Sequence, residues 1–396
     1  SAFLQPGNYF EAGISVLDPN VSGNVKSGWT PNPALRAANI GLENTSVGEM
    51  AGDYYFPSAA LKLQVTDNFS FGLIYDQPFG ADAEYKTDTK TTSAALPPAL
   101  ANQGAFHNGT EGTSVEVKTQ SLSMIFGFQP TENWNIYAGP VYQTVKGDVQ
   151  LRGVAYGGLA AFGDYNANID EDGAAGWLAG FAYQIPEIAL KTSVTYRSEI
   201  EHKIQVTESL GASGLAATIN PALGYTPGQT EITTPQSVNL DFQTGVMANT
   251  VAFANIRWVN WKDFAIRPND FGHASKFIPG KAQGFDLVAY TDDQISATVG
   301  VGRKLNDKWA GNVSVGWDSG AGNPVSTLGP TEGYWNVGLG VQYSPADNYF
   351  IAGGVKYFML GDAKAQAASD FGSSSYVAEF EDNDAWAYGL KIGYRF

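Results

Sequence analysis

The chain has 396 residues, of which 46 are glycine, 13% are aromatic and only 16% are charged. Soluble globular chains carry about a quarter charged residues, and a membrane helix needs about 20 consecutive, mostly apolar residues, which no segment here supplies. The composition therefore argues against a soluble domain and a helical membrane protein, and it favours a membrane β-barrel, whose strands alternate between lipid-facing and lumen-facing residues.

The net charge and the absence of cysteine limit the kinds of ligand and partner that the chain can bind. A net charge of -16 makes nucleic acid an unfavourable partner, because phosphate binding needs a basic face. No cysteine is present, which excludes disulfides and thiolate sites. We expect no metal and no cofactor, and we interpret the acidic run Asp170-Glu171-Asp172 as a solvated loop. Three histidines without a nucleophile-and-base pattern argue against an enzyme.

Alternation of large apolar with small or polar residues recurs along the chain and predicts strands. It is visible in the stretches 121–128, 295–302 and 349–359, and most clearly in 385–396. In the last stretch one face carries Trp386, Tyr388 and Leu390, and the other carries Gly389 and Lys391. One face suits lipid and the other a polar or crowded lumen.

The connections between these strands alternate between short and long. Short turns rich in Asn, Asp and Pro are expected at 66–68, 130–133, 185–187, 248–250, 306–308 and 345–348. Long loops are expected at roughly 22–50, 86–114, 152–174, 209–233, 267–292, 319–331 and 362–375. This pattern predicts one domain over residues 1–396, an all-β, 14-stranded antiparallel transmembrane β-barrel whose two ends lie on the periplasmic side.

Several segments resemble the FadL family of outer-membrane transport proteins over nearly the whole chain. They are PGNYFEAGISVLDPNVSG (6–23), VTDNFSFGLIYDQPFGADAEY (65–85), VTYRSEIEHKI (194–204), IRWVNWKDF (256–264) and EGYWNVGLGVQY (332–343). The resemblance implies a passive channel in the outer membrane of a Gram-negative bacterium that takes up long-chain fatty acids or similar hydrophobic molecules. It also implies an N-terminal hatch of about forty residues before the first strand, a segment that we expect to be omitted or deleted here.

The segment Asp76, Gln77, Pro78, Phe79 and Gly80 interrupts an otherwise long strand from Phe69 to Tyr85. Proline gives no N–H to a strand ladder and glycine packs no side chain, so the strand should bend or lose its pairing here. The resemblance places at this point the inward kink that opens a lateral gap in the family's third strand. The alternative is that Pro78 only ends the regular strand near the external rim.

The resemblance also implies a ligand groove in the third and fourth external loops. Its candidate residues are Leu159, Phe162, Leu210, Leu215, Ile219 and Leu223. In the same loops the stretches 157–161 and 211–219 could form short helices. Exposed apolar residues in polar loops suggest a ligand surface, and the alternative is that they pack the loops against each other.

A carboxylate ligand needs a cation in a poorly hydrated lumen. Three basic residues follow predicted strands near the positions where the resemblance implies head-group contacts: Lys146, Arg152 and Arg267. Arg197 and Glu199, which share a strand face, are expected to form an ion pair or network in the lumen.

We expect such a channel to be a monomer surrounded by outer-membrane lipid and lipopolysaccharide. Two other functions stay open: a structural or adhesive barrel, which predicts a regular third strand and no apolar lumen, and a monoaromatic hydrocarbon channel of the same family.

Overall fold

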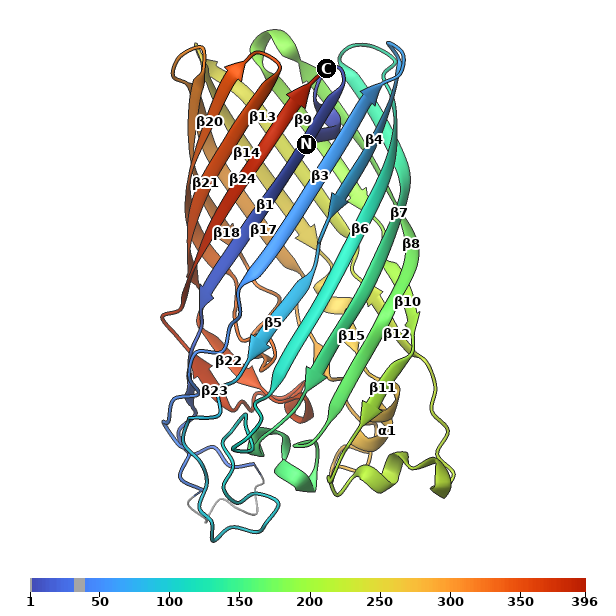
Figure 1. Cartoon of the computed structure of the whole chain (residues 1–396), viewed down its shortest axis with the longest axis vertical. Coiled ribbons are helices and arrows are strands. Elements are labelled where there is room, and N and C mark those ends of the chain that lie inside the picture. Colours follow the sequence, from blue (N-terminus) through green and yellow to red (C-terminus); the bar gives the residue numbers. More distant parts are fainter. Residues whose placement is uncertain (1, 32–39) are drawn as a thin grey trace.

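A computed structural model describes residues 2–31 and 40–396 as a closed β-barrel with long loops at one end and both chain ends at the other (Figure 1). Its main sheet contains 16 strands, but β5 (Gly80–Glu84) continues the line of β4 and β11 (Val206–Ser209) only extends the pairing of β8. The wall is therefore built from 14 antiparallel transmembrane strands, which we call staves, and this confirms the predicted fold.

The staves follow chain order and the barrel closes where β1 pairs with β24, and every neighbour is antiparallel. They are β1 (Tyr9–Asn20), β3 (Tyr54–Gln64), β4 (Phe69–Asp76), β6 (Ser114–Phe128), β7 (Trp134–Gln150), β8 (Asn166–Ile185), β9 (Leu190–Arg197), β13 (Ser237–Met247), β14 (Thr250–Val259), β17 (Gln294–Lys304), β18 (Trp309–Asp318), β20 (Tyr334–Ala346), β21 (Tyr349–Leu360) and β24 (Asp384–Arg395). Among the described residues, no helix is long and apolar enough to cross a membrane.

The period-2 pattern orients each stave as predicted. On β24 the side chains of Trp386, Tyr388, Leu390 and Ile392 are 40–54% exposed and form part of the outer apolar band. On β6 the large residues Leu122, Met124, Phe126 and Phe128 are likewise exposed, while Ile125 between them is buried in the lumen. Successive side chains of a strand point to opposite faces, so an apolar set at every second position becomes a lipid-facing surface.

The short connections all lie at the end that holds the chain termini, and their residues explain their tightness (Figure 1). The turn between β13 and β14 is Ala248-Asn249, and Asn249 adopts a left-handed φ of 56°, which asparagine tolerates better than most residues. Ala189 has a similar φ of 55° after the 3-10 turn η5 (Pro186–Ile188).

At the opposite end the loops contain most of the remaining elements. These are the strands β2 (Asn24–Val25), β10 (Ile200–Ile204), β12 (Thr230–Thr234), β15 (Ala265–Ile266), β16 (Val288–Ala289), β19 (Val325–Ser326), β22 (Ala363–Gln366) and β23 (Ala378–Phe380), the helix α1 (Asn269–Ser275), and the 3-10 turns η3 (Val154–Tyr156), η4 (Gly158–Ala160), η6 (Ala216–Ile219), η7 (Pro221–Leu223), η8 (Trp261–Asp263) and η9 (Ala368–Asp370). The strands β19, β22, β23 and β2 form one small sheet, and buried apolar side chains from several loops form a continuous core beside it.

The third loop is shorter than expected, because β8 already begins at Asn166. The acidic run Asp170-Glu171-Asp172 therefore lies within this strand, and its interpretation as a solvated loop was wrong. Asp172 instead lies 3.2 Å from the buried ring of His202 on β10.

The first described residues enter the lumen rather than running outside the wall. The 3-10 turn η1 (Ala2–Leu4) inserts Phe3, which is 2% exposed and packs edge-to-face on Tyr137 at 5.4 Å between ring centroids. Wall cations hold the backbone that follows: Lys62 Nζ donates to the Gln5 carbonyl at 2.9 Å, and Lys191 Nζ to the Leu4 carbonyl at 3.4 Å. Carbonyl groups that have left water need such donors.

Candidate functional site

A cavity of about 290 Å³ lies in the lumen, with Phe3 among its lining residues. Apolar side chains such as Ile74, Ile125 and Leu178 form part of its wall, and Arg197, Arg257 and Asp76 also line it. Small-molecule sites combine apolar side chains with polar groups that orient the ligand, and polar or charged side chains make up half of this lining.

The charged groups that line this cavity differ in their protein partners, since Asp241 accepts from the Asn239 and Asn255 amides at 2.7 Å each, while the other three have few. Arg197 Nη1 donates to Ser123 Oγ at 3.3 Å. Within the described part of the chain, the guanidinium of Arg257 makes no hydrogen bond or ion pair, and Asp76 Oδ1 is buried without a hydrogen-bond partner. Buried polar groups normally find partners in the protein, so the unused donors of the two arginines are the groups that remain available to a molecule in the cavity.

The expected lumen pair of Arg197 and Glu199 was wrong. Glu199 follows the end of β9 and is exposed, while Arg197 faces the lumen. The stave ends between the two residues, so their i, i+2 spacing no longer places them on one face. Arg257 was not among the residues predicted from the sequence, although the alternation of strand residues identifies it. Its neighbour Ile256 on β14 is 47% exposed on the lipid side, so Arg257 points to the lumen.

The third stave is interrupted at the segment that the sequence indicated. β4 ends at Asp76 and β5 begins at Gly80, so Gln77, Pro78 and Phe79 lie outside the ladder. β3 pairs with β4 only from Ala59 to Gln64, and β5 pairs with β6 alone among the staves. The stretch Tyr54–Ser58 of β3 is thus left without a ladder partner on this side (Figure 1).

A second cavity of about 250 Å³ occupies this break, and we call it the wall opening. Its lining includes Tyr54 and Phe56 of β3, Gln77 and Phe79 of the break, and Lys118 of β6. The Tyr54 hydroxyl spans the outer part of the break, because it accepts from Asp82 N at 2.6 Å and lies 3.0 Å from the Asp82 carbonyl. A side chain here replaces the missing backbone ladder.

A third cavity of about 850 Å³ lies at the periplasmic end of the barrel. Polar lumen residues, among them Gln243, Asn312 and Gln342, line it together with Arg303. We call this third cavity the periplasmic vestibule. Phe3, which lines the lumen cavity, is not among the residues that line the vestibule.

The residues expected to form the loop groove are mostly packed against other loops. Phe162, Leu210 and Leu215 are 2–8% exposed, and the Phe162 ring lies 4.4 Å from that of Phe271 on α1. Leu159 and Ile219 are half-buried, and only Leu223 is largely exposed, at 70%. The three buried side chains belong to the core of the loops and present no open surface, as the packing alternative expects.

The structure places none of the three expected carboxylate contacts at the lumen cavity. Lys146 is exposed, on the opposite face of β7 from the buried Val145. Arg267 is ion-paired with Asp286 at 2.7 Å in the external loops. The alternation of strand residues therefore directs Lys146 away from the lumen, and Arg267 is already paired with a loop carboxylate.

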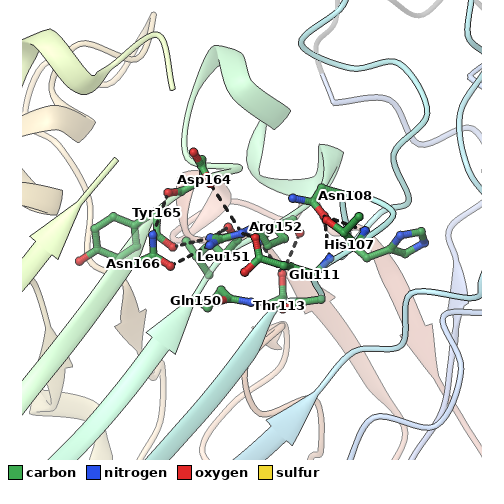
Figure 2. Close-up of polar contacts among 12 residues, drawn as sticks. His107, Asn108, Glu111, Thr113, Gln150, Leu151, Arg152, Asp164, Tyr165 and Asn166 are labelled. Atoms are coloured by element: carbon green, nitrogen blue, oxygen red, sulfur yellow. Dashed lines mark hydrogen bonds and ion pairs between the residues drawn. The ribbon is translucent and has the colours of Figure 1, made fainter. Parts of the chain in front are cut away.

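Arg152 is instead a structural residue of the loops (Figure 2). Its side chain is almost fully buried and lies 3.4 Å from Glu111 and 3.7 Å from Asp164. The guanidinium also donates to the carbonyls of Leu151 and Tyr165 at 2.8 and 3.0 Å. The guanidinium nitrogens Nε, Nη1 and Nη2 each donate to a protein acceptor, so Arg152 connects the second and third loops rather than binding a ligand.

Comparison with known proteins places this geometry among outer-membrane transport proteins. Residues 3–396 match the family model described as "Outer membrane protein transport protein (OMPP1/FadL/TodX)". No curated protein matches the chain by sequence.

Solved structures share the fold at low sequence identity. A Pseudomonas aeruginosa FadL homologue is 15% identical with a TM-score of 0.70, the match covering 99% of this chain and 91% of that one. The P. putida toluene transporter TodX is 13% identical with a TM-score of 0.62, covering 100% and 91%. The Ralstonia pickettii toluene transporter TbuX is 12% identical with a TM-score of 0.56, again covering 100% and 91%.

Proposed function

Because the chain belongs to the OMPP1/FadL/TodX family of outer-membrane transport proteins, we propose that it is a passive channel for long-chain fatty acids that leave its lumen sideways through the wall opening. The coarser part of this function follows from the family: the protein is a Gram-negative outer-membrane β-barrel that transports hydrophobic compounds. The substrate and the exit route are the proposal.

The observation that carries the exit route is the position of the interrupted stave. The break at Gln77–Phe79 has the lumen cavity on one side and the wall opening on the other. An acyl chain that entered the periplasm would expose its methylene groups to water at about 0.8 kcal/mol each. Sideways release into the bilayer avoids that cost, and it requires neither an energy source nor a covalent step.

The two arginines of the lumen cavity support a carboxylate substrate, since Asp241, which also lines it, is already occupied by two amide donors. No residue that the structure describes forms a hydrogen bond or ion pair with the guanidinium of Arg257, and Arg197 donates one hydrogen bond, to a serine hydroxyl. Arginine binds carboxylates in a bidentate, charge-assisted manner. The apolar wall formed by Ile74, Ile125 and Leu178 then suits the first part of the acyl chain.

A second candidate is a channel for monoaromatic hydrocarbons. TodX and TbuX are both titled toluene transporters, and the wall opening is lined by the rings of Tyr54, Tyr55, Phe56 and Phe79. The adhesive alternative predicted a regular third strand, and the interruption at residues 77–79 argues against it.

The remaining parts of the proposal concern partners and chemistry. The cavities lie within one closed barrel, which supports a channel that is complete as a monomer, surrounded by outer-membrane lipid and lipopolysaccharide. The family is one of transport proteins, and we infer that this member catalyses no reaction. His202, for example, has both ring nitrogens engaged, with Asp172 and Gln143.

The exit route is tested by restoring the ladder in the third stave. The double substitution Pro78→Val/Gly80→Thr returns a backbone N–H at residue 78 and a β-branched side chain at residue 80. We expect the unpaired Tyr54–Ser58 to gain a partner and the uptake of radiolabelled oleate to fall at least tenfold in cells that lack a channel of this family.

The matched control is Pro57→Val, which replaces a proline of the neighbouring β3 on its exposed face and leaves the break intact. It should take up oleate at the wild-type rate. Wild-type uptake by a correctly inserted Pro78→Val/Gly80→Thr variant would show that the substrate leaves by another route.

A further inference from the structure

Phe79 occupies the junction between the lumen cavity and the wall opening. Of the described residues that line these two cavities, it is the one common to both. Its neighbours divide between them, since Asp76 and Pro78 line the lumen cavity while Gln77 and Gly80 line the wall opening. A molecule that passes from one cavity to the other must therefore pass Phe79.

The Phe79 ring rests on an aromatic cluster of the fifth external loop. Its centroid is 5.3 Å from the ring of Trp261 in a T-shaped arrangement at 75°. Trp261 contacts Phe264 and Tyr290, each at 5.1 Å, and its Nε1 donates to Gln294 Oε1 at 2.7 Å. Trp261 is thus fixed by a hydrogen bond and two rings, and it offers Phe79 a defined resting position.

The backbone and the side chain of Phe79 are restrained very differently. Phe79 N donates to Thr119 Oγ1 at 2.9 Å, and Thr119 Oγ1 donates to the Phe79 carbonyl at 2.6 Å. These bonds to β6 hold the break in place. The edge-to-face contact with Trp261 is weaker, because such a ring pair shifts an equilibrium only roughly two- to tenfold. The ring can therefore leave Trp261 while the backbone of the break stays where it is.

We propose that Phe79, held by Trp261, is the gate and size filter between the lumen cavity and the wall opening. This inference rests on the proposed lateral release and names the residue that controls it. A slender acyl chain passes after a rotation of one ring, whereas a bulky hydrophobic group needs a wider displacement. Phe79 touches the substrate, and Trp261 acts through Phe79 as a positioning residue.

The gate is tested with Phe79→Ala and two hydrophobic acids of different width, oleate and a pyrene-labelled dodecanoate. We expect Phe79→Ala to raise the initial uptake rate of oleate two- to tenfold and that of the pyrene probe by a larger factor. Phe79→Trp should lower both rates, the pyrene rate more strongly. The ratio of the two rates is the decisive measurement, because a general loosening of the barrel would raise both equally.

The matched control is Phe285→Ala. Phe285 belongs to a different ring cluster of the same loop, with Phe162 and Phe271, and lines neither cavity. It should leave the ratio of the two uptake rates unchanged, and the mobility of unheated barrels in electrophoresis verifies that each variant is folded.

The outcomes separate the gate from the exit route. Loss of uptake in Pro78→Val/Gly80→Thr together with an unchanged rate ratio in folded Phe79→Ala would overturn the gate alone. Wild-type uptake in Pro78→Val/Gly80→Thr would overturn lateral release, and the gate with it. A changed ratio in Phe285→Ala equal to that in Phe79→Ala would also overturn the gate, because the packing of the external loops rather than the junction would then control passage.

Discussion

At the scale of single residues, the two lumen arginines make the choice between a carboxylate and a hydrocarbon measurable. Arg257→Met keeps much of the side-chain length and removes the charge from the lumen cavity. A hydrogen bond to a charged group contributes about 1.5–3 kcal/mol, so oleate uptake at low substrate concentration should fall roughly tenfold or more. Toluene has no carboxylate, and its uptake by the same variant should be unchanged.

The control for this prediction is Arg303→Met. Arg303 lines the periplasmic vestibule rather than the lumen cavity, so its loss changes the net charge of the barrel without touching the proposed site. Equal losses of oleate and toluene uptake in Arg257→Met would contradict a carboxylate contact and point to an altered lumen.

Single residues also mark the limit of what the sequence could predict about the site. Alternation and turn spacing assign each side chain a face, and this parity could have separated the lumen-facing Arg257 from the outward Lys146. It could not reveal that Glu111, Asp164 and loop carbonyls surround Arg152, because those partners come from distant parts of the chain. The local sequence pattern predicts to which face of the wall a side chain points, and tertiary contacts decide whether a basic side chain already has a protein partner.

At the scale of elements, the external loops are held together at the strand β11. Glu208 of this strand accepts from the backbone N–H groups of Asp270 and Phe271 at 2.8 and 3.0 Å, in the first turn of α1. The Tyr165 hydroxyl of the third loop donates to the same carboxylate at 2.5 Å. Three loops therefore meet at one side chain, which is largely shielded from water.

Burial makes this junction sensitive to pH. Desolvation raises the pKa of Glu208 from 4.5 to about 7, outweighing the hydrogen bonds, which lower it. A group whose pKa is raised in the folded state binds its proton more tightly there than in the unfolded state. Its contribution to stability is thus complete below pH 4.5 and is lost as the pH rises through about 7.

We therefore expect the loops to open more readily at pH 8 than at pH 5, by up to roughly 3 kcal/mol, at about 1.4 kcal/mol for each pH unit between the two pKa values. Hydrogen exchange of the α1 amides, corrected for the intrinsic effect of pH, measures this difference. Glu208→Gln cannot lose a proton and should abolish it. A pH dependence that persists in Glu208→Gln would assign the effect to another group.

The elements also show why some segments were predictable and others were not. The break in the third stave follows from Pro78 and Gly80 themselves, since proline lacks a donor wherever it lies. The turn at Ala248-Asn249 follows from asparagine in the same way. The expected groove residues Phe162 and Leu215 are buried in the core of the loops. The sequence alone does not predict this, because an apolar residue in a loop can equally well bind a ligand or pack on another loop, and the contact of Phe162 with Phe271 of α1 joins distant parts of the chain.

At the scale of the whole molecule, the barrel is inside out relative to a soluble protein. The fourteen staves could be counted from the sequence because each repeats the same alternation and each turn carries its own signal. The three cavities could not be located in this way, because their shapes depend on how far the loops and residues 2–8 reach into the lumen. Closure of the barrel determines which face of each strand contacts lipid, while the side chains in the lumen determine which molecules can pass.

This orientation predicts that the same substitution changes stability by different amounts on the two faces of a single stave. Leu339 lies near the middle of β20 and is 60% exposed on the lipid side, whereas Gln342, an odd number of residues further on, lines the periplasmic vestibule. An arginine in the middle of the lipid face of a barrel costs about 2–4 kcal/mol, so Leu339→Arg should lower the free energy of unfolding in lipid vesicles by that amount. Gln342→Arg places the same charge in a wide polar space of about 850 Å³ and should change stability by less than about 1 kcal/mol. Urea titration of both variants in the same vesicles measures the difference, and equal losses of stability would mean that β20 does not present Leu339 to the bilayer.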